Sequence, residues 1–163
     1  MNIDITKEEY RELLDVLFIA EWVLHAFDAG KKVRTKRHDA IIQKLYSHAA
    51  AQGMNNLIAL DKDNGVFSPS GELENTTPAW EVIDNFTNET FWDELIHRLS
   101  ERDVARQVGG YERMDALSTP EFITMETPVL ERYETEFDKQ GLERLEIVES
   151  FAAVPSFPPA THD

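Results

Sequence analysis

The sequence of 163 residues contains no cysteine. This absence excludes disulfide bonds, thiolate nucleophiles and zinc sites ligated by cysteine. A chain of this length buries roughly 70% of the surface that its unfolded form exposes, so it can build a core without such cross-links. The lack of cysteine is also typical of a reducing compartment, and we therefore expect a cytoplasmic protein.

Positive charge and long apolar runs are also scarce. Sixteen Lys and Arg residues stand against 31 Asp and Glu residues, which gives a net charge of −15. An acidic surface repels phosphate backbones, so nucleic acid is not expected as a partner. The longest apolar stretch, residues 16–27, is interrupted by Glu21 and His25 and is too short to cross a bilayer. We predict no membrane partner and no cofactor.

The apolar residues that are present recur mainly with a helical period. The clearest case begins at Thr6 and Glu9, which have the spacing of a capping box, and Gly30 is the expected stop. Apolar residues cover nearly every side of this first helix, so it should be buried in a core or placed in a subunit interface. We predict further helices that start between Thr35 and Asp39, at Thr77-Pro78, after Thr87 or Asn88, and from Pro128 to Gln140, with a kink or a new helix at Ser100.

Other segments predict a small amount of β structure. Asn64-Gly65 between two short apolar runs indicates a hairpin within Leu57 to Phe67, and Leu142 to Val148 is strand-like. The predicted class is therefore mainly α with a minor β component. We expect a single compact domain of about five helices around a buried N-terminal helix over residues 1–150, followed by a Pro-rich tail at 151–163.

One group of polar residues interrupts the first predicted helix. Glu21, His25 and Asp28 share a helical face because they are spaced by four and three residues. A carboxylate, an imidazole and a second carboxylate could bind a metal ion or hold a base in one tautomer. The alternative is a hydrogen bond between Glu21 and His25, with Asp28 solvated at the helix end.

The dipeptide His38-Asp39 resembles the one in the metal-dependent phosphohydrolases called HD domains. Those proteins also need an earlier His and a distant Asp on facing helices. The resemblance covers two residues and implies a metal-dependent hydrolase only if such partners converge on the dipeptide.

The second group is a basic stretch in this acidic chain. Five cations lie between Lys31 and Arg37. The first two follow a helix, where the dipole is negative and cations are favoured, but Arg34, Lys36 and Arg37 approach the positive start of the next helix. We therefore predict an anion or partner site at these three residues. An acidic protein partner, a second subunit and a phosphate-bearing ligand stay open, as does pairing with the acidic surface of the chain itself.

A third feature is a row of arginines in the second half. Ser100–Gly110 resembles the first helix and turn of a bacterial helix-turn-helix, with Ala105 and Gly109 at the usual spacing. The resemblance implies DNA binding, but Asp115 stands where an apolar packing residue belongs. The row consists of Arg98, Arg102 and Arg106, and we expect Glu94, Glu101 and Asp103 to neutralise it.

These patterns leave two functions open. The first is a non-enzymatic interaction or regulatory protein, with self-association as one form. The second is a metal- or phosphate-handling enzyme that uses Glu21, His25 and Asp28 beside the basic stretch. We favour the first because no catalytic pattern in the sequence is complete.

Overall fold

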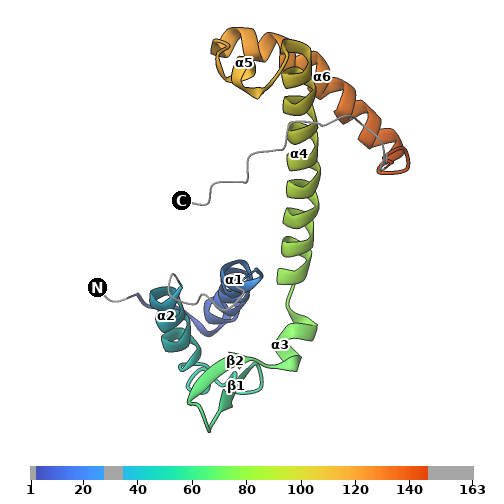
Figure 1. Ribbon diagram of the computed structural model, residues 1–163. Helices are drawn as coiled ribbons and strands as arrows, with labels where there is room; N and C mark the ends of the chain where they lie inside the picture. Colours follow the sequence, from blue (N-terminus) through green and yellow to red (C-terminus); the bar gives the residue numbers. More distant parts are fainter. Residues whose placement is uncertain (1–2, 28–34, 147–163) are drawn as a thin grey trace. The chain divides into compact units, whose positions relative to one another are not determined.

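The computed structural model describes residues 3–27 and 35–146 (Figure 1). Within these ranges the chain forms six helices and one antiparallel sheet of two strands, so the predicted class, mainly α with a minor β component, is confirmed. None of the helices in the described ranges is long and apolar enough to cross a membrane. The elements are α1 (Lys7–His25), α2 (Lys36–Tyr46), β1 (Ile58–Asp61), β2 (Val66–Pro69), α3 (Gly71–Thr76), α4 (Ala79–Val108), α5 (Tyr111–Asp115) and α6 (Thr119–Gln140).

The chain divides into two compact units, Met1–Asn88 and Glu89–Asp163. The boundary falls inside α4, so no loop or linker separates the units. The single domain predicted for 1–150 stays a prediction, and each unit is described here by itself. The predicted tail at 151–163 lies outside the described residues.

The first unit is built on α1, which begins where the sequence predicts. The Thr6 hydroxyl accepts a hydrogen bond from the backbone N–H of Glu9, and the Glu9 carboxylate accepts one from the backbone N–H of Thr6. This reciprocal capping box satisfies two helix-start donors and fixes the first turn. The core of the unit combines α1 with α2, the hairpin, α3 and the start of α4; its fully buried members are Tyr10, Leu14, Tyr46 and Leu73.

The predicted hairpin is confirmed. Strands β1 and β2 pair from Ile58 opposite Pro69 to Asp61 opposite Val66. The Asp61 carboxylate accepts hydrogen bonds from the next turn, and Gly65 adopts φ +66°, which other residues rarely tolerate. A side chain of α2 joins the sheet because the Gln43 amide accepts from the Phe67 N–H and donates to its carbonyl, both at 2.7 Å.

A buried polar chain links α1 to the residues just before α4. The Arg11 guanidinium and the Thr77 hydroxyl both donate to the same oxygen of Asp15, each at 2.6 Å. The Thr77 oxygen accepts in turn from the backbone N–H of Ala79 at 3.1 Å. Asp15 and Thr77 are both buried, so this chain satisfies polar groups that would otherwise be costly in the core.

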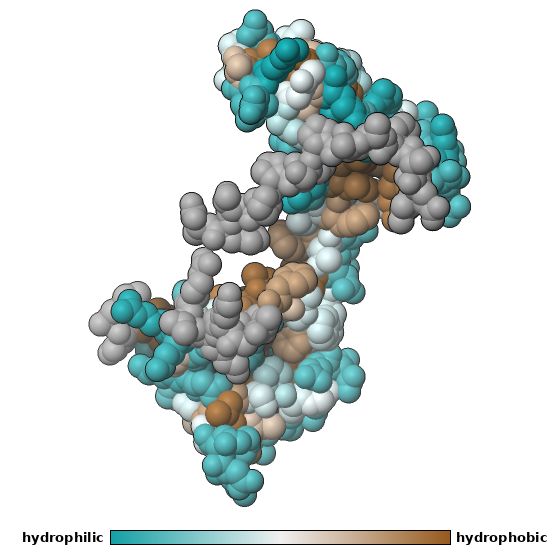
Figure 2. Space-filling model, viewed as in Figure 1, coloured by the Kyte–Doolittle hydropathy of each residue, from teal (hydrophilic) through white to brown (hydrophobic). Residues whose placement is uncertain are grey.

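The outer face of α1 differs from the expectation that the helix is buried on nearly every side. Val16 and Val23 lie two helical turns apart and are 59% and 55% exposed, and Phe27, one turn further on, is 95% exposed. We call these three residues the outer stripe of α1. Figure 2 shows that hydrophobic residues, drawn in brown, reach the molecular surface among hydrophilic ones. Only some of the apolar side chains of this helix are therefore buried in the core of its own unit.

Helix α4 corrects two predicted boundaries. It runs for 30 residues without interruption, past the expected break at Thr87 or Asn88 and past the expected kink or restart at Ser100. Ser100 is completely buried in the middle of the helix, and the Asp103 carboxylate contacts residues of α6 instead of capping a helix start. Helix α4 ends at Val108. The next residue, Gly109, adopts φ +91°, and the N–H groups of Gly109 and Gly110 both donate to the carbonyl of Ala105.

Helix α6 corrects two further predictions. It begins at Thr119, nine residues before the predicted start at Pro128, because Ser118 and Glu121 form a capping box there. Pro128 lies inside the helix. The strand predicted from Leu142 is wrong as far as residue 146, because the chain turns after Gly141 and residues 142–146 pair with no strand in the described ranges. The second unit has an aromatic core around Phe137. The centroid of the Phe137 ring lies 5.6 Å from that of Trp92 and 5.7 Å from that of Tyr133.

Candidate functional site

Two of the three residues in the predicted metal cluster are described, and both reach α2. The Tyr46 hydroxyl donates to Oε2 of Glu21 at 2.9 Å, and Nε2 of His25 lies 3.0 Å from Oδ1 of Asp39. The third residue, Asp28, lies outside the described residues. Residues 3–27 and 35–146 contain no group of three or more His, Asp or Glu side chains that could hold a metal ion. The metal assignment to Glu21, His25 and Asp28 therefore stays a prediction.

Asp39, which belongs to the dipeptide that resembles the one in HD domains, is the partner of His25 in this region. Its carboxylate bonds the Thr35 hydroxyl at 3.2 Å through one oxygen and the His25 ring through the other. It lies in the first turn of α2, where a negative charge is favoured by the helix dipole. Its neighbour His38, the other half of the predicted dipeptide, is exposed. The contact between Asp39 and His25 therefore orients the His25 ring and joins the end of α1 to the start of α2.

Tyr46 acts as a permanent donor in this region. Burial raises the pKa of the Tyr46 phenol far above its usual value, and the neighbouring Glu21 carboxylate raises it further. The phenol stays neutral and donates its proton in the hydrogen bond to Glu21, because ionising the phenol would place two negative charges side by side in a buried place. The contact explains why a Glu is tolerated on the side of α1 that faces α2.

The predicted basic site is only partly visible. Arg34 lies outside the described residues, whereas Lys36 and Arg37 are exposed in the first turn of α2. No carboxylate of the described residues lies within 4.0 Å of either cation. Asp39 supplies the negative charge that the helix start favours, so the two cations are available to another group. Binding of an anion or an acidic partner at Arg34, Lys36 and Arg37 stays a prediction.

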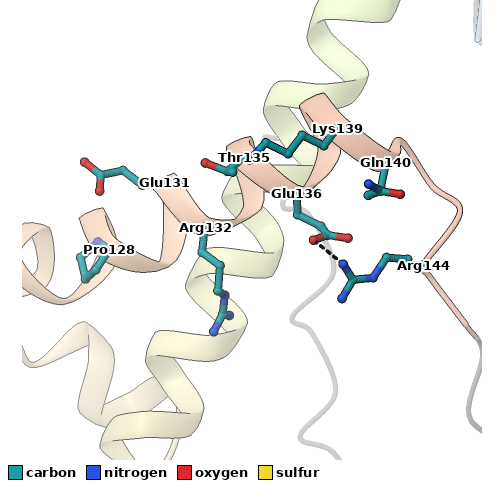
Figure 3. Close-up of a pocket in the computed structure, with 8 residues that line it drawn as sticks. All are labelled: Pro128, Glu131, Arg132, Thr135, Glu136, Lys139, Gln140 and Arg144. Atoms are coloured by element: carbon teal, nitrogen blue, oxygen red, sulfur yellow. Dashed lines mark hydrogen bonds and ion pairs between the residues drawn. The ribbon is translucent and has the colours of Figure 1, made fainter.

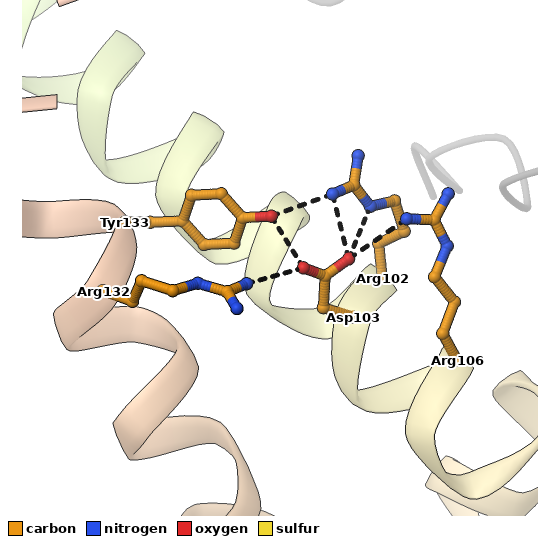
Figure 4. A network of polar contacts seen from close by, with 5 residues as sticks. All are labelled: Arg102, Asp103, Arg106, Arg132 and Tyr133. Atoms are coloured by element: carbon orange, nitrogen blue, oxygen red, sulfur yellow. Dashed lines mark hydrogen bonds and ion pairs between the residues drawn. The ribbon is translucent and has the colours of Figure 1, made fainter. Parts of the chain in front are cut away.

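A second polar site, in the other unit, has Asp103 at its centre (Figure 4). One carboxylate oxygen accepts from Nε of Arg102 at 2.9 Å and from Nη1 of Arg106 at 3.2 Å. The other accepts from Nη2 of Arg132 at 2.9 Å and from the Tyr133 hydroxyl at 2.7 Å. Arg102 also donates to the Tyr133 oxygen at 2.9 Å. We call these five residues the arginine cluster; they come from α4 and α6.

The arginine cluster holds its groups in fixed protonation states. Burial raises the pKa of the Asp103 carboxyl, but hydrogen bonds from Tyr133 and Arg102 and the charges of Arg102 and Arg106 outweigh burial and lower it. Burial and the bond to Asp103 raise the pKa of Tyr133. The cluster therefore contains three cations, one anion and one neutral phenol at neutral pH, which is a net charge of +2.

A hollow of about 560 Å³ lies along α6 beside the cluster (Figure 3). Its wall includes Arg132, Thr135, Lys139 and Gln140 from the helix and Arg144 from the turn that follows. Arg144 donates to Oε2 of Glu136 at 3.1 Å. Arg132 thus belongs both to the wall of the hollow and to the arginine cluster. The wall also includes the carboxylates of Glu131 and Glu136, so the hollow presents side chains of both charges.

The sequence reveals one half of the arginine cluster. Ion pairs of 2.8–3.2 Å join Arg98 to Glu94 and join both Arg102 and Arg106 to Asp103. The predicted neutralisation of the row is therefore only partial, because Glu101 forms no ion pair with it within the described residues. Arg132 and Tyr133 stand about 30 residues later, and no local pattern marks them as partners of Asp103. The segment after Gly110 forms a helix of only five residues, α5, so the helix-turn-helix resemblance does not extend to a recognition helix.

Comparison with protein-family models, with curated proteins and with solved structures finds no match for this chain.

Proposed function

We propose that this chain is a non-enzymatic protein-interaction module that associates with a second copy of itself through the outer stripe of α1. The observation that carries the proposal is the exposure of Val16 and Val23 on one line of α1 and of Phe27 just past the end of that helix. Exposed apolar side chains gathered on one face are typical of an interaction surface. We place this module in the cytoplasm because the chain has no cysteine.

The charges at the two ends of the stripe favour a second copy as the partner. Glu9 and Glu12 continue the same helical line toward the start of α1 and are exposed. Lys36 and Arg37 lie near the other end, because the contact of His25 with Asp39 brings the start of α2 to the end of α1. An antiparallel pair of α1 helices would place the acidic end of each copy beside the basic end of the other.

The loss of dimer affinity that a substitution in the stripe should cause follows from the apolar surface that the interface buries. Burying one valine side chain contributes about 1.5 kcal/mol, and a two-fold interface buries each residue twice. Replacing Val23 by Glu should therefore weaken dimerisation by about 3 kcal/mol, or roughly a hundredfold in Kd. The introduced charge adds a desolvation cost to this loss.

The experiment is light scattering coupled to size exclusion over a range of concentrations. We expect the wild-type chain to approach twice its monomer mass of 18.7 kDa, and Val23→Glu to remain monomeric. Val66→Glu is the matched control, because Val66 is a comparably exposed valine on the hairpin, away from the stripe. A wild-type chain that stays monomeric at every concentration, or equal losses in both variants, would refute the proposal.

The enzymatic alternative rests on two separate polar contacts between α1 and α2, that of Glu21 with Tyr46 and that of His25 with Asp39. If Glu21, His25 and Asp28 bind a metal, a divalent metal should raise the melting temperature of the wild type, and His25→Ala should abolish that rise. A melting temperature that does not respond to metal in the wild type would eliminate this alternative.

A further inference from the structure

We propose that the arginine cluster is a binding site for the phosphate group of a small phosphorylated molecule. This site belongs to the second unit and is independent of the outer stripe of α1. The starting observation is an imbalance of charge. Three guanidinium groups converge on Asp103, and within the described residues no other carboxylate lies within 4.0 Å of them. A phosphate dianion would match the excess of two positive charges.

The donors that a phosphate needs are present. A guanidinium carries five N–H donors in a planar fork, a geometry that suits two oxygens of a phosphate. Arg106 and Arg132 each use a single nitrogen, Nη1 and Nη2, in their bonds to Asp103. The carboxylate itself is saturated, because its two oxygens accept from four residues. The other N–H groups of these two arginines therefore have no acceptor in the cluster.

These donors are accessible. The side chains of Arg106 and Arg132 are 52% and 62% exposed, whereas those of Asp103 and Arg102 are 17% and 27% exposed. The cluster thus has an inner part, which holds the helices together, and an outer part, which faces solvent. A ligand can reach the outer pair without displacing Asp103.

The outer arginines are also held in place before any ligand arrives. The Arg132 guanidinium lies 5.0 Å from the centroid of the Tyr133 ring, and Tyr133 is fixed by its bonds to Asp103 and Arg102. Ordering a free arginine side chain costs about 2 kcal/mol of rotamer entropy. The contacts within the cluster already order these side chains, so a ligand loses less entropy in binding them than in binding an arginine that is free in solvent.

The surroundings favour one phosphate group over a polymer of phosphates. Glu94 lies on α4 and Glu131 and Glu134 lie on α6, all exposed. A nucleic acid backbone that followed either helix would meet these carboxylates after one or two phosphates. The hollow beside Arg132 presents Lys139, Gln140 and Thr135 to the remainder of a small molecule, together with the carboxylates of Glu131 and Glu136.

The experiment measures the binding of inorganic phosphate to the full chain at constant ionic strength, by calorimetry and by chemical-shift changes of the arginine Nε–H signals. We expect saturable binding, and Arg106→Gln and Arg132→Gln should each weaken it about tenfold, which corresponds to the loss of one charged hydrogen bond. Arg98→Gln is the matched control. Arg98 is 58% exposed on the same helix but is neutralised one-to-one by Glu94, so its removal should change the affinity less than twofold.

Two further probes separate the sources of the phosphate. Adenosine monophosphate should bind more tightly than inorganic phosphate if the hollow receives the rest of the molecule. Duplex DNA that binds more tightly than either, with a steep salt dependence, would replace the small-molecule proposal by a nucleic-acid one. A purely structural cluster would give no saturable phosphate binding, or an equal loss in Arg98→Gln, and either result would overturn the proposal.

Discussion

Replacing Asp15 by Ala tests whether the buried polar chain holds the first unit together. The change removes the acceptor of both Arg11 and Thr77. The Thr77 hydroxyl is buried, and a buried donor left without a partner costs about 1–3 kcal/mol. Arg11 is about one quarter exposed and can turn to water, so its share is that of a surface ion pair, about 0–1 kcal/mol. We expect a loss of about 2 kcal/mol in the free energy of unfolding.

The assay is urea unfolding followed by tryptophan fluorescence. The chain has three tryptophans, and in a Trp92→Phe background the other two, Trp22 and Trp80, both report on the first unit. Asp84→Ala is the control, because Asp84 is an exposed acid in the part of α4 that belongs to the first unit, and its loss should change the free energy by less than about 0.5 kcal/mol. A loss for Asp15→Ala no larger than that of the control would refute the reasoning.

A double-mutant cycle identifies the contact responsible. Thr77→Val removes the hydroxyl that donates to Asp15 and that accepts from the N–H of Ala79. If the bond between Asp15 and Thr77 carries the stability, the double variant should be less destabilised than the sum of the two single variants by about 1 kcal/mol. Strict additivity would show that the two residues act separately.

Two further predictions concern the second unit. The folded-state pKa of Asp103 is lowered, so its contribution to stability is complete above its unfolded pKa of about 3.9 and is lost as the pH falls through the lower folded value. Below about pH 4, the free energy of unfolding should therefore fall less steeply with pH in Asp103→Asn. The assay is the fluorescence of Trp92 in a background without the other tryptophans, and an unchanged pH profile would contradict the prediction. Gly109→Ala should cost about 1–2 kcal/mol, because Gly109 adopts φ +91°, a backbone conformation that residues with a Cβ rarely adopt. Gly71→Ala, where a Cβ would meet nothing within 4 Å, is the control, and equal losses in urea unfolding would contradict the argument.

The elements that the sequence predicts well are those set by neighbouring residues. The capping box of Thr6 and Glu9 fixes the start of α1, and Asn64-Gly65 fixes the hairpin, because in both cases the groups that bond lie within a few positions. Ser118 and Glu121 form an equally local signal for the start of α6. This capping box predicts the start of α6 better than Pro128 does, because Pro128 lies inside the helix.

The features that the sequence does not predict depend on distant residues. Ser100 and Asp103 have the spacing of a helix start, but the Asp103 carboxylate is engaged by Arg132 and Tyr133, about 30 residues away. That long-range contact engages the carboxylate that a new helix start would need as a cap, so the continuous helix is favoured over a break at Ser100. The partner of His25 was missed for the same reason, since Asp39 reaches it only when α1 and α2 pack together.

The continuity of α4 has a consequence for dissecting the protein. A truncation at the boundary between the units would leave residues 79–88 as a ten-residue helical end on the first fragment. Isolated helical segments shorter than about 12–15 residues are marginal in water. A fragment that ends at 88 would therefore fray over Ile83, which is a member of the first unit's core. Expression of the first unit alone calls for an end point further along α4, where the helix still continues.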